Sequence, residues 1–267
     1  MLLKLNASYD STSRLISYRH PFNQTSLNAL IGHPVVLTIG EKTTCLGCLK
    51  VKKTQRGYCY LCSRALARCD LCFLNPHLCH FKIGTCREPQ WAEQVCMQEH
   101  LVYLALTSHP KIGITKVTQV PTRWIDQGAI WAKILVRTTS RGDSGLIEKD
   151  LTDLGWKGQS QWRDLLKGKT SVQPEQMKEL YEQALKAALD SAQQRDISYR
   201  VLGCDNKIFE PIFPIDTFPV KAISLPFPGT FEGVLTGIKG QYLFFGESGA
   251  VNMRAYEGHE GSLERIL

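Results

Sequence analysis

Cysteine thiols are the residues whose spacing points most directly to chemistry in this chain. Nine of the ten cysteines fall within residues 45–96, and the tenth is Cys204. Two CxxC pairs, separated by ten residues, open this block in the order Cys45, Cys48, Cys59 and Cys62. Each pair turns the backbone around an ion and presents two thiolates, so the two pairs predict one tetrahedral structural zinc site. The alternatives are free buried thiols, or a redox-active CxxC, which would follow a strand of a βαβ unit.

The segment "CDLCFLNPHLCHFKIGTCREPQWAEQVCMQEH" carries more metal-binding side chains than one site needs. We predict a second zinc whose preferred ligands are Cys72, Cys79, Cys86 and Cys96, with His100, His80 and Cys69 as substitutes. His100 follows Cys96 by one helical turn, a spacing that suits a second ligand for the same ion. It equally suits a residue that hydrogen-bonds to a ligand, or one that caps the segment ahead of the next strand. Because four cysteines are available for each ion, neither site needs an open coordination position, and both are predicted to be structural.

Basic side chains surround the first cysteine pairs. Residues 45–68 contain no acidic residue and carry Lys50, Lys52, Lys53, Arg56, Arg64 and Arg68, with Tyr58 and Tyr60 between them. A basic segment with interleaved aromatic rings suits phosphate contact and base stacking. The alternative is a solvated surface, with the tyrosines packed against the metal site and part of the charge balancing the thiolates. The sequence leaves both interpretations open.

A second set of chemical groups follows the cysteines. It consists of Tyr103, Lys111, Arg123 and Glu148, with Trp124 and Gln127 close to the arginine. A phenol can act through water as a base, a guanidinium binds phosphate, and a carboxylate holds a divalent metal ion, so this set suits phosphodiester hydrolysis. Lys111 or Arg123 would stabilise the developing charge, and Trp124 and Gln127 would position a nucleic-acid strand. Each residue also has an ordinary interpretation, as a core aromatic, an internal ion pair or an exposed helix glutamate.

Apolar periodicity indicates the elements that would position these groups. Strands are expected at residues 33–40, 101–106, 111–115 and 129–138, helices at 145–154 and 173–195, and a hairpin turn at 246–249. These patterns predict an α+β protein in four parts. A β-rich N-terminal segment covers 1–44, a cysteine-rich zinc-binding region 45–100, an α/β domain 101–196 and a β-rich C-terminal module 197–267. The two β-rich ends are candidates to pair into one module.

The order of hairpin, arginine and glutamate resembles the GIY-YIG nuclease superfamily. Leu101-Val102-Tyr103 stands for its first motif and Lys111-Ile112-Gly113 for its second, followed by Arg123 and Glu148. The resemblance covers about residues 100–165 and implies a GIY-YIG-like α/β domain with Mg²⁺ or Mn²⁺ at Glu148. Leu101 replaces the first glycine of the family pattern and Lys111 the second tyrosine, as in a branch of the superfamily that carries lysine there. These departures bear on catalysis more than on the fold.

A wider resemblance covers nearly the whole chain. The paired CxxC motifs, "GTCREPQW", "VYLA", "KIGIT", "RWIDQGA" and "GIKGQYL" occur here in one order, and together they resemble the bacterial domain of unknown function 2797 family. That resemblance implies no particular activity.

Composition narrows the class of protein. The chain has 267 residues, of which 43 % are hydrophobic and 21 % charged, so a buried core is expected and global disorder is not. A formal net charge of +7 is compatible with DNA or RNA as a partner without requiring it. The apolar runs are far shorter than the roughly 18 residues of a membrane span, and no signal-peptide core is present, so a cytoplasmic location without a membrane partner is expected. In that compartment, ten cysteines favour metal over disulfides.

Three functions follow from these observations. The first is a zinc-containing nucleic-acid-binding protein that acts as a divalent-metal-dependent phosphodiesterase. The second is a non-catalytic, zinc-scaffolded module that binds nucleic acid or a protein partner, which Lys111 favours. The third is a zinc- or redox-responsive regulator, suggested by the surplus of ligands between Cys69 and His100.

Overall fold

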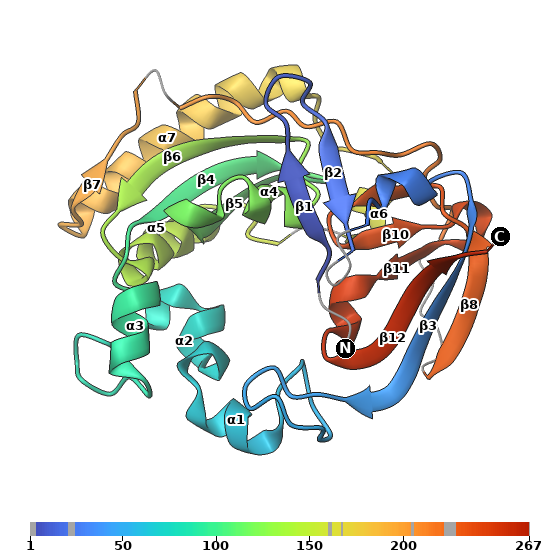
Figure 1. Cartoon of the computed structure of the whole chain (residues 1–267). Coiled ribbons are helices and arrows are strands. Elements are labelled where there is room, and N and C mark those ends of the chain that lie inside the picture. The colour runs from blue at the N-terminus through green and yellow to red at the C-terminus, as the bar shows by residue number, and fades with distance from the viewer. Residues whose placement is uncertain are drawn as a thin grey trace.

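The computed structural model describes residues 4–20, 25–159, 162–166, 168–203, 206–221 and 228–266, so Cys204 lies outside the described residues. An α/β domain and a β module are joined by a bend of short helices, which is the cysteine-rich region (Figure 1). The bend leaves the β module after β3 (Pro34–Thr43) and enters the α/β domain at β4 (His100–Leu106). In this part of the chain, no helix combines the length and the apolar character needed to cross a bilayer.

An antiparallel sheet with the strand order β5-β4-β6-β7 forms the centre of the α/β domain. Its remaining strands are β5 (Pro110–Lys116), β6 (Trp131–Thr138) and β7 (Tyr199–Arg200), and its helices are α4 (Thr122–Asp126), α5 (Arg141–Asp153), α6 (Trp162–Leu166) and α7 (Met177–Gln194). The strands and helices expected in this region are confirmed. Helix α5 begins earlier than expected, because Ser140 Oγ caps it by accepting a hydrogen bond from Asp143 N at 3.1 Å.

Strand β4 is buried on both faces, which explains its unbroken apolar sequence. Val102, Leu104 and Leu106 belong to the core under α5 and α7. Tyr103 and Ala105 belong to a second core, which the α/β domain shares with the β module. Because side chains alternate along a strand, this one strand contributes to both cores and fixes the position of the hairpin that it forms with β5.

The β module joins both ends of the chain. Strand β3 lies between β8 (Gly229–Val234) and β12 (His259–Arg265) and pairs with both in antiparallel register, which confirms the expected pairing of the two β-rich segments. The other strands are β1 (Asn6–Tyr9), β2 (Ile16–Arg19), β9 (Gly237–Lys239), β10 (Tyr242–Phe244) and β11 (Ala250–Asn252). The expected turn at 246–249 is a 3-10 turn between β10 and β11.

Helix α4 attaches the α/β domain to the β module through Asp126. Its Oδ1 accepts a hydrogen bond from Gln241 Nε2 at 2.9 Å, and its Oδ2 pairs with Lys4 Nζ at 2.9 Å. Gly240 has a φ of +62°, and a Cβ there would lie 2.9 Å from the Asp126 carbonyl oxygen, so only glycine allows this approach. The segments "RWIDQGA" and "GIKGQYL", far apart in the sequence, therefore lie side by side.

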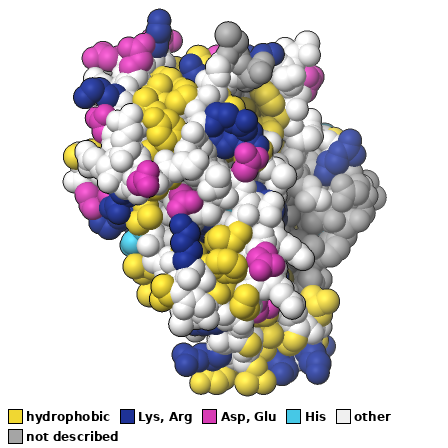
Figure 2. Space-filling view, turned by 90° about the vertical axis from the view of Figure 1, so that its left-hand side faces the viewer, with side chains coloured by type: hydrophobic (Ala, Val, Ile, Leu, Met, Phe, Trp, Pro, Cys, Tyr) yellow, Lys and Arg dark blue, Asp and Glu magenta, His cyan; other side chains and the backbone are white. Residues whose placement is uncertain are grey.

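The cysteine-rich region has little apolar core of its own. Its helices α1 (Tyr60–Ala65) and α2 (Leu71–Leu74) bury no residue fully, and Leu71 and Leu74 are 60 % and 67 % exposed. Only Ala92 is buried within α3 (Pro89–Val95). Figure 2 shows apolar and basic side chains together at the lower end of the molecule, where this region lies. A segment that buries so little surface needs cross-links to offset its conformational entropy, and bound metal ions supply such cross-links.

Lys239 is a buried cation without an acidic partner among the described residues, and its removal makes a first testable prediction. The side chain is 3 % exposed, and its ammonium lies 5.7 Å from the Phe213 ring centroid and 5.9 Å from that of Phe218. Burial lowers the pKa of Lys239 to about 8. We expect Lys239→Met to raise the free energy of unfolding at pH 7 by about 1–3 kcal/mol, because methionine fills the same space without a buried charge.

The cost of burying Lys239 depends on pH. Below pH 8 the folded protein carries the full cost of the charged lysine, whereas the unfolded chain holds the proton up to roughly pH 10.4. The stability of the wild type should therefore rise relative to Lys239→Met between about pH 8 and 10. Urea unfolding at pH 7 and pH 10 measures this, with Lys178→Met on the exposed face of α7 as the control. A loss of stability in Lys239→Met at pH 7 would mean that the charge itself is needed.

Candidate functional site

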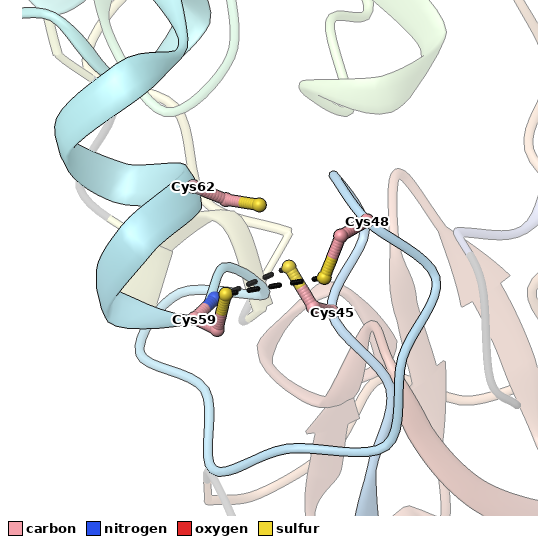
Figure 3. Close-up of side chains that lie close together, drawn as sticks. All are labelled: Cys45, Cys48, Cys59 and Cys62. Carbon is pink, nitrogen blue, oxygen red and sulfur yellow. Dashed lines mark hydrogen bonds between the residues drawn. The ribbon is translucent and has the colours of Figure 1, made fainter.

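The first cysteine group is assembled from a loop and a helix terminus. Cys45 and Cys48 lie in the loop after β3, and Cys59 and Cys62 lie at the start of α1. The four Sγ atoms are all within 4.8 Å of one another. Figure 3 shows the four side chains converging from the two segments. The arrangement fits one tetrahedral ion, so this group is a candidate structural metal site, consistent with zinc.

Backbone hydrogen bonds prepare these thiols for a cation. The Cys45 Sγ accepts hydrogen bonds from Cys59 N at 3.2 Å and Gly47 N at 3.4 Å (Figure 3 draws the first). Burial opposes ionisation of Cys45, but the backbone N–H groups outweigh it and lower the pKa of this thiol to about 6. Burial and the neighbouring thiols raise the pKa of Cys62 to about 12. Four such thiols cannot all ionise side by side unless a cation lies between them, which is the chemistry expected of a metal site.

The second cysteine group lines one cavity but is less tightly gathered. Cys72, Cys79, Cys86 and Cys96 all lie on its wall, together with His80 and Arg141; we call it the cysteine cavity. Among the described residues, no three of these four Sγ atoms lie within 4.8 Å of one another. The sequence-based preference for these four cysteines is compatible with this placement, and their role as ligands stays a prediction.

The substitute ligands lie elsewhere or have other partners. Cys69 and His100 do not line the cysteine cavity. His100 is buried on β4, where its Nδ1 lies 2.8 Å from the Gln98 carbonyl oxygen and burial lowers its pKa to about 4. Asp70, Cys72 and His80 approach one another within 4.8 Å. Asp70, however, already forms an ion pair with Arg87, whose Nε lies 2.6 Å from Asp70 Oδ2. The three residues are therefore part of a local network of polar contacts.

The second set of chemical groups is brought together by four elements. Tyr103 lies on β4, Lys111 on β5, Arg123 on α4 and Glu148 on α5. Arg123 and Glu148 lie close enough to Tyr103 and to Lys111 to act on the ionisation of both. Arg141, at the start of α5, also acts on Glu148. We refer to Lys111, Arg123, Arg141 and Glu148 as the charged site.

Glu148 is the centre of the charged site and has no direct partner. Among the described residues it makes no hydrogen bond and no ion pair, although Lys111, Arg141 and Arg123 all favour its ionised form. Burial outweighs these cations and raises the pKa of Glu148 above its ordinary value. Burial also lowers the pKa of Lys111 to about 8. A half-buried carboxylate surrounded by cations that do not touch it leaves a place for a ligand that carries both a cation and anionic oxygens.

Tyr103 and Trp124 are enclosed by the core. Tyr103 is 0 % exposed, its hydroxyl donates to Gln127 Oε1 at 3.1 Å, and Arg123 lies within hydrogen-bonding reach. Trp124 is 3 % exposed and packs against Tyr103 and Phe209 at ring-centroid distances of 5.8 Å and 5.3 Å. The prediction that Trp124 contacts nucleic acid is therefore wrong for this structure, because its ring faces offer no surface for a base. Gln127 holds Tyr103, and Tyr103 does not reach solvent water.

Gly113 fixes Tyr103 against the second strand of the hairpin, which gives a second testable prediction. The two residues face each other in the β4–β5 register, and a Cβ at Gly113 would lie 2.6 Å from the Tyr103 hydroxyl oxygen. We expect Gly113→Ala to lower the free energy of unfolding by about 1–3 kcal/mol, because the tyrosine ring must shift within a closed core. Urea unfolding measures this. Gly203→Ala is the control, because no described atom lies within 4 Å of the new Cβ, and equal losses in both variants would contradict this explanation.

The basic residues predicted to contact nucleic acid are accessible. Lys50, Lys52, Lys53 and Arg56 are all exposed in the loop between the two cysteine pairs. None of them is paired with an acidic residue of the described chain. This loop is free to meet a polyanion, whereas the aromatic contribution expected from Trp124 is absent.

Arg141 was not among the residues predicted to form the site, although the sequence around it contains a signal. Arg141 precedes Glu148 by seven residues, two turns of a helix, so both project from one face of α5. The expected helix began at residue 145 and left Arg141 in a loop. Ser140 followed by Asp143, a capping pattern, would have moved the start of the helix to Arg141.

The fold and the first cysteine group define an α+β protein with a four-cysteine cluster suited to a structural metal ion. The chain belongs to the family described as "Protein of unknown function (DUF2797)", whose pattern it matches over residues 32–260. No curated protein and no solved structure matches the chain.

Proposed function

We propose that this protein is a zinc-scaffolded nucleic-acid-binding protein whose charged site hydrolyses phosphodiester bonds with the help of a divalent ion. The observation that carries the proposal is the Glu148 carboxylate, which pairs with none of the described residues and lies among Lys111, Arg123 and Arg141. A phosphodiester with a bound divalent ion would suit this group. Glu148 would hold the ion, and Lys111 and Arg123 would bind the phosphate oxygens.

The order of elements supports a GIY-YIG-like interpretation of this domain. A hairpin of β4 and β5 is followed by a helix with Arg123, a third strand beside β4, and a helix with Glu148. This is the order on which the resemblance was based. By this resemblance, Glu148 would be the metal ligand and Arg123 the phosphate-binding residue.

Each residue of the site has a separate task in the proposed reaction. Glu148 would hold Mg²⁺ or Mn²⁺, which would act as a Lewis acid on the scissile phosphate. Arg123 binds the phosphate oxygens, and Lys111, buried and close by, stabilises charge that develops during the reaction. Tyr103 is closed to solvent, so we assign it the task of holding Arg123 and Gln127 in place, in preference to activating water.

The loop between the cysteine pairs would extend the interface for nucleic acid. Lys50, Lys52, Lys53 and Arg56 are exposed, and the metal site fixes both ends of the loop that carries them. Contacts from such side chains to phosphates release counterions and make binding sensitive to salt. The loop contributes affinity without sequence specificity, because phosphate contacts carry no base information.

A non-catalytic binding module is the second candidate, and one observation favours it. Tyr103 is 0 % exposed and cannot reach a water molecule beside the substrate, and Lys111 occupies the position of a second tyrosine. In that case the same cations grip a phosphate and no bond is cleaved. The exposed Leu71 and Leu74 of α2, which flank Cys72 in the chain, suit a protein partner for such a module.

The salt dependence of binding tests nucleic-acid recognition. We expect a clear negative slope of log K against log salt for single- or double-stranded DNA or RNA. Replacing Lys50, Lys52 and Lys53 together with glutamine should reduce the magnitude of this slope by about 2–3, since each lost phosphate contact removes about 0.9. Lys178→Gln and Lys186→Gln, on the exposed side of α7, serve as the matched control. A flat salt dependence on all four nucleic acids would remove nucleic acid as the partner.

A further inference from the structure

The cysteine cavity has the size and the walls of a site for one ion. Its volume is ≈ 20 Å³, and its apolar walls are the rings of Phe73, Phe81 and Trp91. Thiols enter from four separate segments: Cys72 from α2, Cys79 from the end of the 3-10 turn Pro76–Leu78, Cys86 from the loop before α3, and Cys96 from the end of α3. A cavity of this volume accommodates one water-sized occupant, and a purely apolar occupant would not explain four thiols on its wall.

Arg141 lies on the wall of the cysteine cavity. Its Nη2 donates to the Phe73 carbonyl oxygen at 2.6 Å, and its guanidinium stacks over the Phe73 ring at 4.5 Å. Its Nε is fully buried and has no hydrogen-bond partner among the described residues. The guanidinium lines the cysteine cavity and lies close enough to Cys96 and Cys72 to be influenced by their charge. A buried N–H donor without a partner is unfavourable, so an anionic acceptor at this position would satisfy it.

We propose that Cys72, Cys79, Cys86 and Cys96 bind a second structural zinc ion and that Arg141 balances its charge. Four thiolates around one Zn²⁺ leave a net negative charge, which the buried guanidinium offsets by donating hydrogen bonds to sulfur. The Sγ atoms must draw closer together than they lie here, and all four already border one small space. Asp70 and His80 remain outside the ion's ligand set, because Asp70 pairs with Arg87 Nε at 2.6 Å and His80 Nδ1 lies 2.7 Å from Thr85 Oγ1.

The second ion has a structural consequence for the charged site. Helix α5 begins directly against the cavity. A Cβ at Gly142 would lie 3.2 Å from the Cys79 Cβ, and a Cβ at Gly145 would lie 2.6 Å from the backbone nitrogen of His77. Arg141 and Glu148 belong to this same helix. The ion therefore ties the cysteine-rich region to the helix that carries Glu148, and Arg141 is a positioning residue that lines the cavity and also acts electrostatically on Glu148.

Counting zinc per chain tests this inference independently of any enzymatic activity. Protein purified without chelator should contain two zinc ions per chain by inductively coupled plasma mass spectrometry. The single variants Cys86→Ser, Cys79→Ser and Cys59→Ser should each contain one zinc ion per chain. The double variant that combines Cys59→Ser and Cys86→Ser should contain none. His80→Ala should keep both ions. Retention of the first zinc in Cys86→Ser shows that the variant is folded around that site.

Arg141→Met separates charge balance from simple filling of the cavity. This variant should still bind two ions but should release the second to a competing chelator at about 10- to 100-fold lower chelator concentration, the usual effect of removing a hydrogen-bonding partner of a ligand. Arg141→Lys should hold the second zinc against the chelator better than Arg141→Met, but less well than the wild type. One zinc in the wild type, two in Cys86→Ser, or one in His80→Ala would overturn the ligand set. Unchanged release from Arg141→Met would overturn the role of the arginine.

Discussion

Glu148→Gln should lower Mg²⁺-dependent phosphodiester hydrolysis by about 10²- to 10³-fold and leave nucleic-acid binding equal to or tighter than that of the wild type. Glutamine has nearly the same shape but is a poorer ligand for a hard cation. It also leaves Lys111, Arg123 and Arg141 without a nearby carboxylate, so their attraction for phosphate increases. Single-turnover cleavage of a labelled strand and a parallel binding titration measure the two effects.

The matched control for this substitution is Glu182→Gln on the exposed side of α7. It removes the same charge far from the charged site and should leave both rate and affinity unchanged. If Glu148→Gln and the control cleave at equal rates, Glu148 holds no catalytic ion. If neither the wild type nor the variants cleave and the wild type binds, the non-catalytic function stands.

Cys59→Ser should release the first zinc and unfold residues 45–68 of the cysteine-rich region, while the α/β domain and the second cysteine group stay folded. The apparent binding free energy of a structural zinc is about 10–16 kcal/mol, and this region buries too little apolar surface to stay folded without it. Limited proteolysis followed by mass spectrometry should show new cleavages between about residues 45 and 68. Chelation of the wild type with a strong zinc chelator should produce the same fragments.

Ser63→Ala in α1 is the control for Cys59→Ser. Ser63 Oγ donates to the Tyr60 carbonyl oxygen at 2.8 Å and borders the cysteine group without offering it a ligand. This variant should keep its zinc and resist protease like the wild type. Full protease resistance in Cys59→Ser would show that the region folds on its own and that the four thiols are not a structural cross-link.

The first cysteine group and the central sheet could be predicted from the sequence for local reasons. A CxxC pair forms a tight turn with two thiols on one side, so local spacing alone predicts how the thiols are arranged within each pair, Cys45 with Cys48 and Cys59 with Cys62. The strands and helices of the α/β domain follow from apolar periodicity in the same local way. Pairing of β3 with β8 and β12 was expected only from the β-rich composition of both ends.

The remaining features depend on contacts between distant segments. Trp124 is enclosed because α4 packs against the β module through Asp126 and Gln241, and nothing in "RWIDQGA" predicts which face will be covered. The cysteines of the cavity come from four short segments without regular spacing, so the sequence left their ligand set open. Lys239 looks like an exposed strand residue in the sequence and becomes buried only when β9 meets the aromatic rings of Phe213 and Phe218.

A cleavage assay of the zinc-loaded wild type tests the proposed function most directly. It compares reactions that contain Mg²⁺ with reactions that contain EDTA, which removes Mg²⁺ from solution. The substrates are end-labelled single- and double-stranded DNA and RNA at low salt, followed on a denaturing gel, with zinc content measured after each incubation. The account predicts products from at least one substrate with Mg²⁺, none with EDTA, and none from Glu148→Gln at equal times. Binding without products on every substrate, or products that persist without Mg²⁺ and without Glu148, would contradict it.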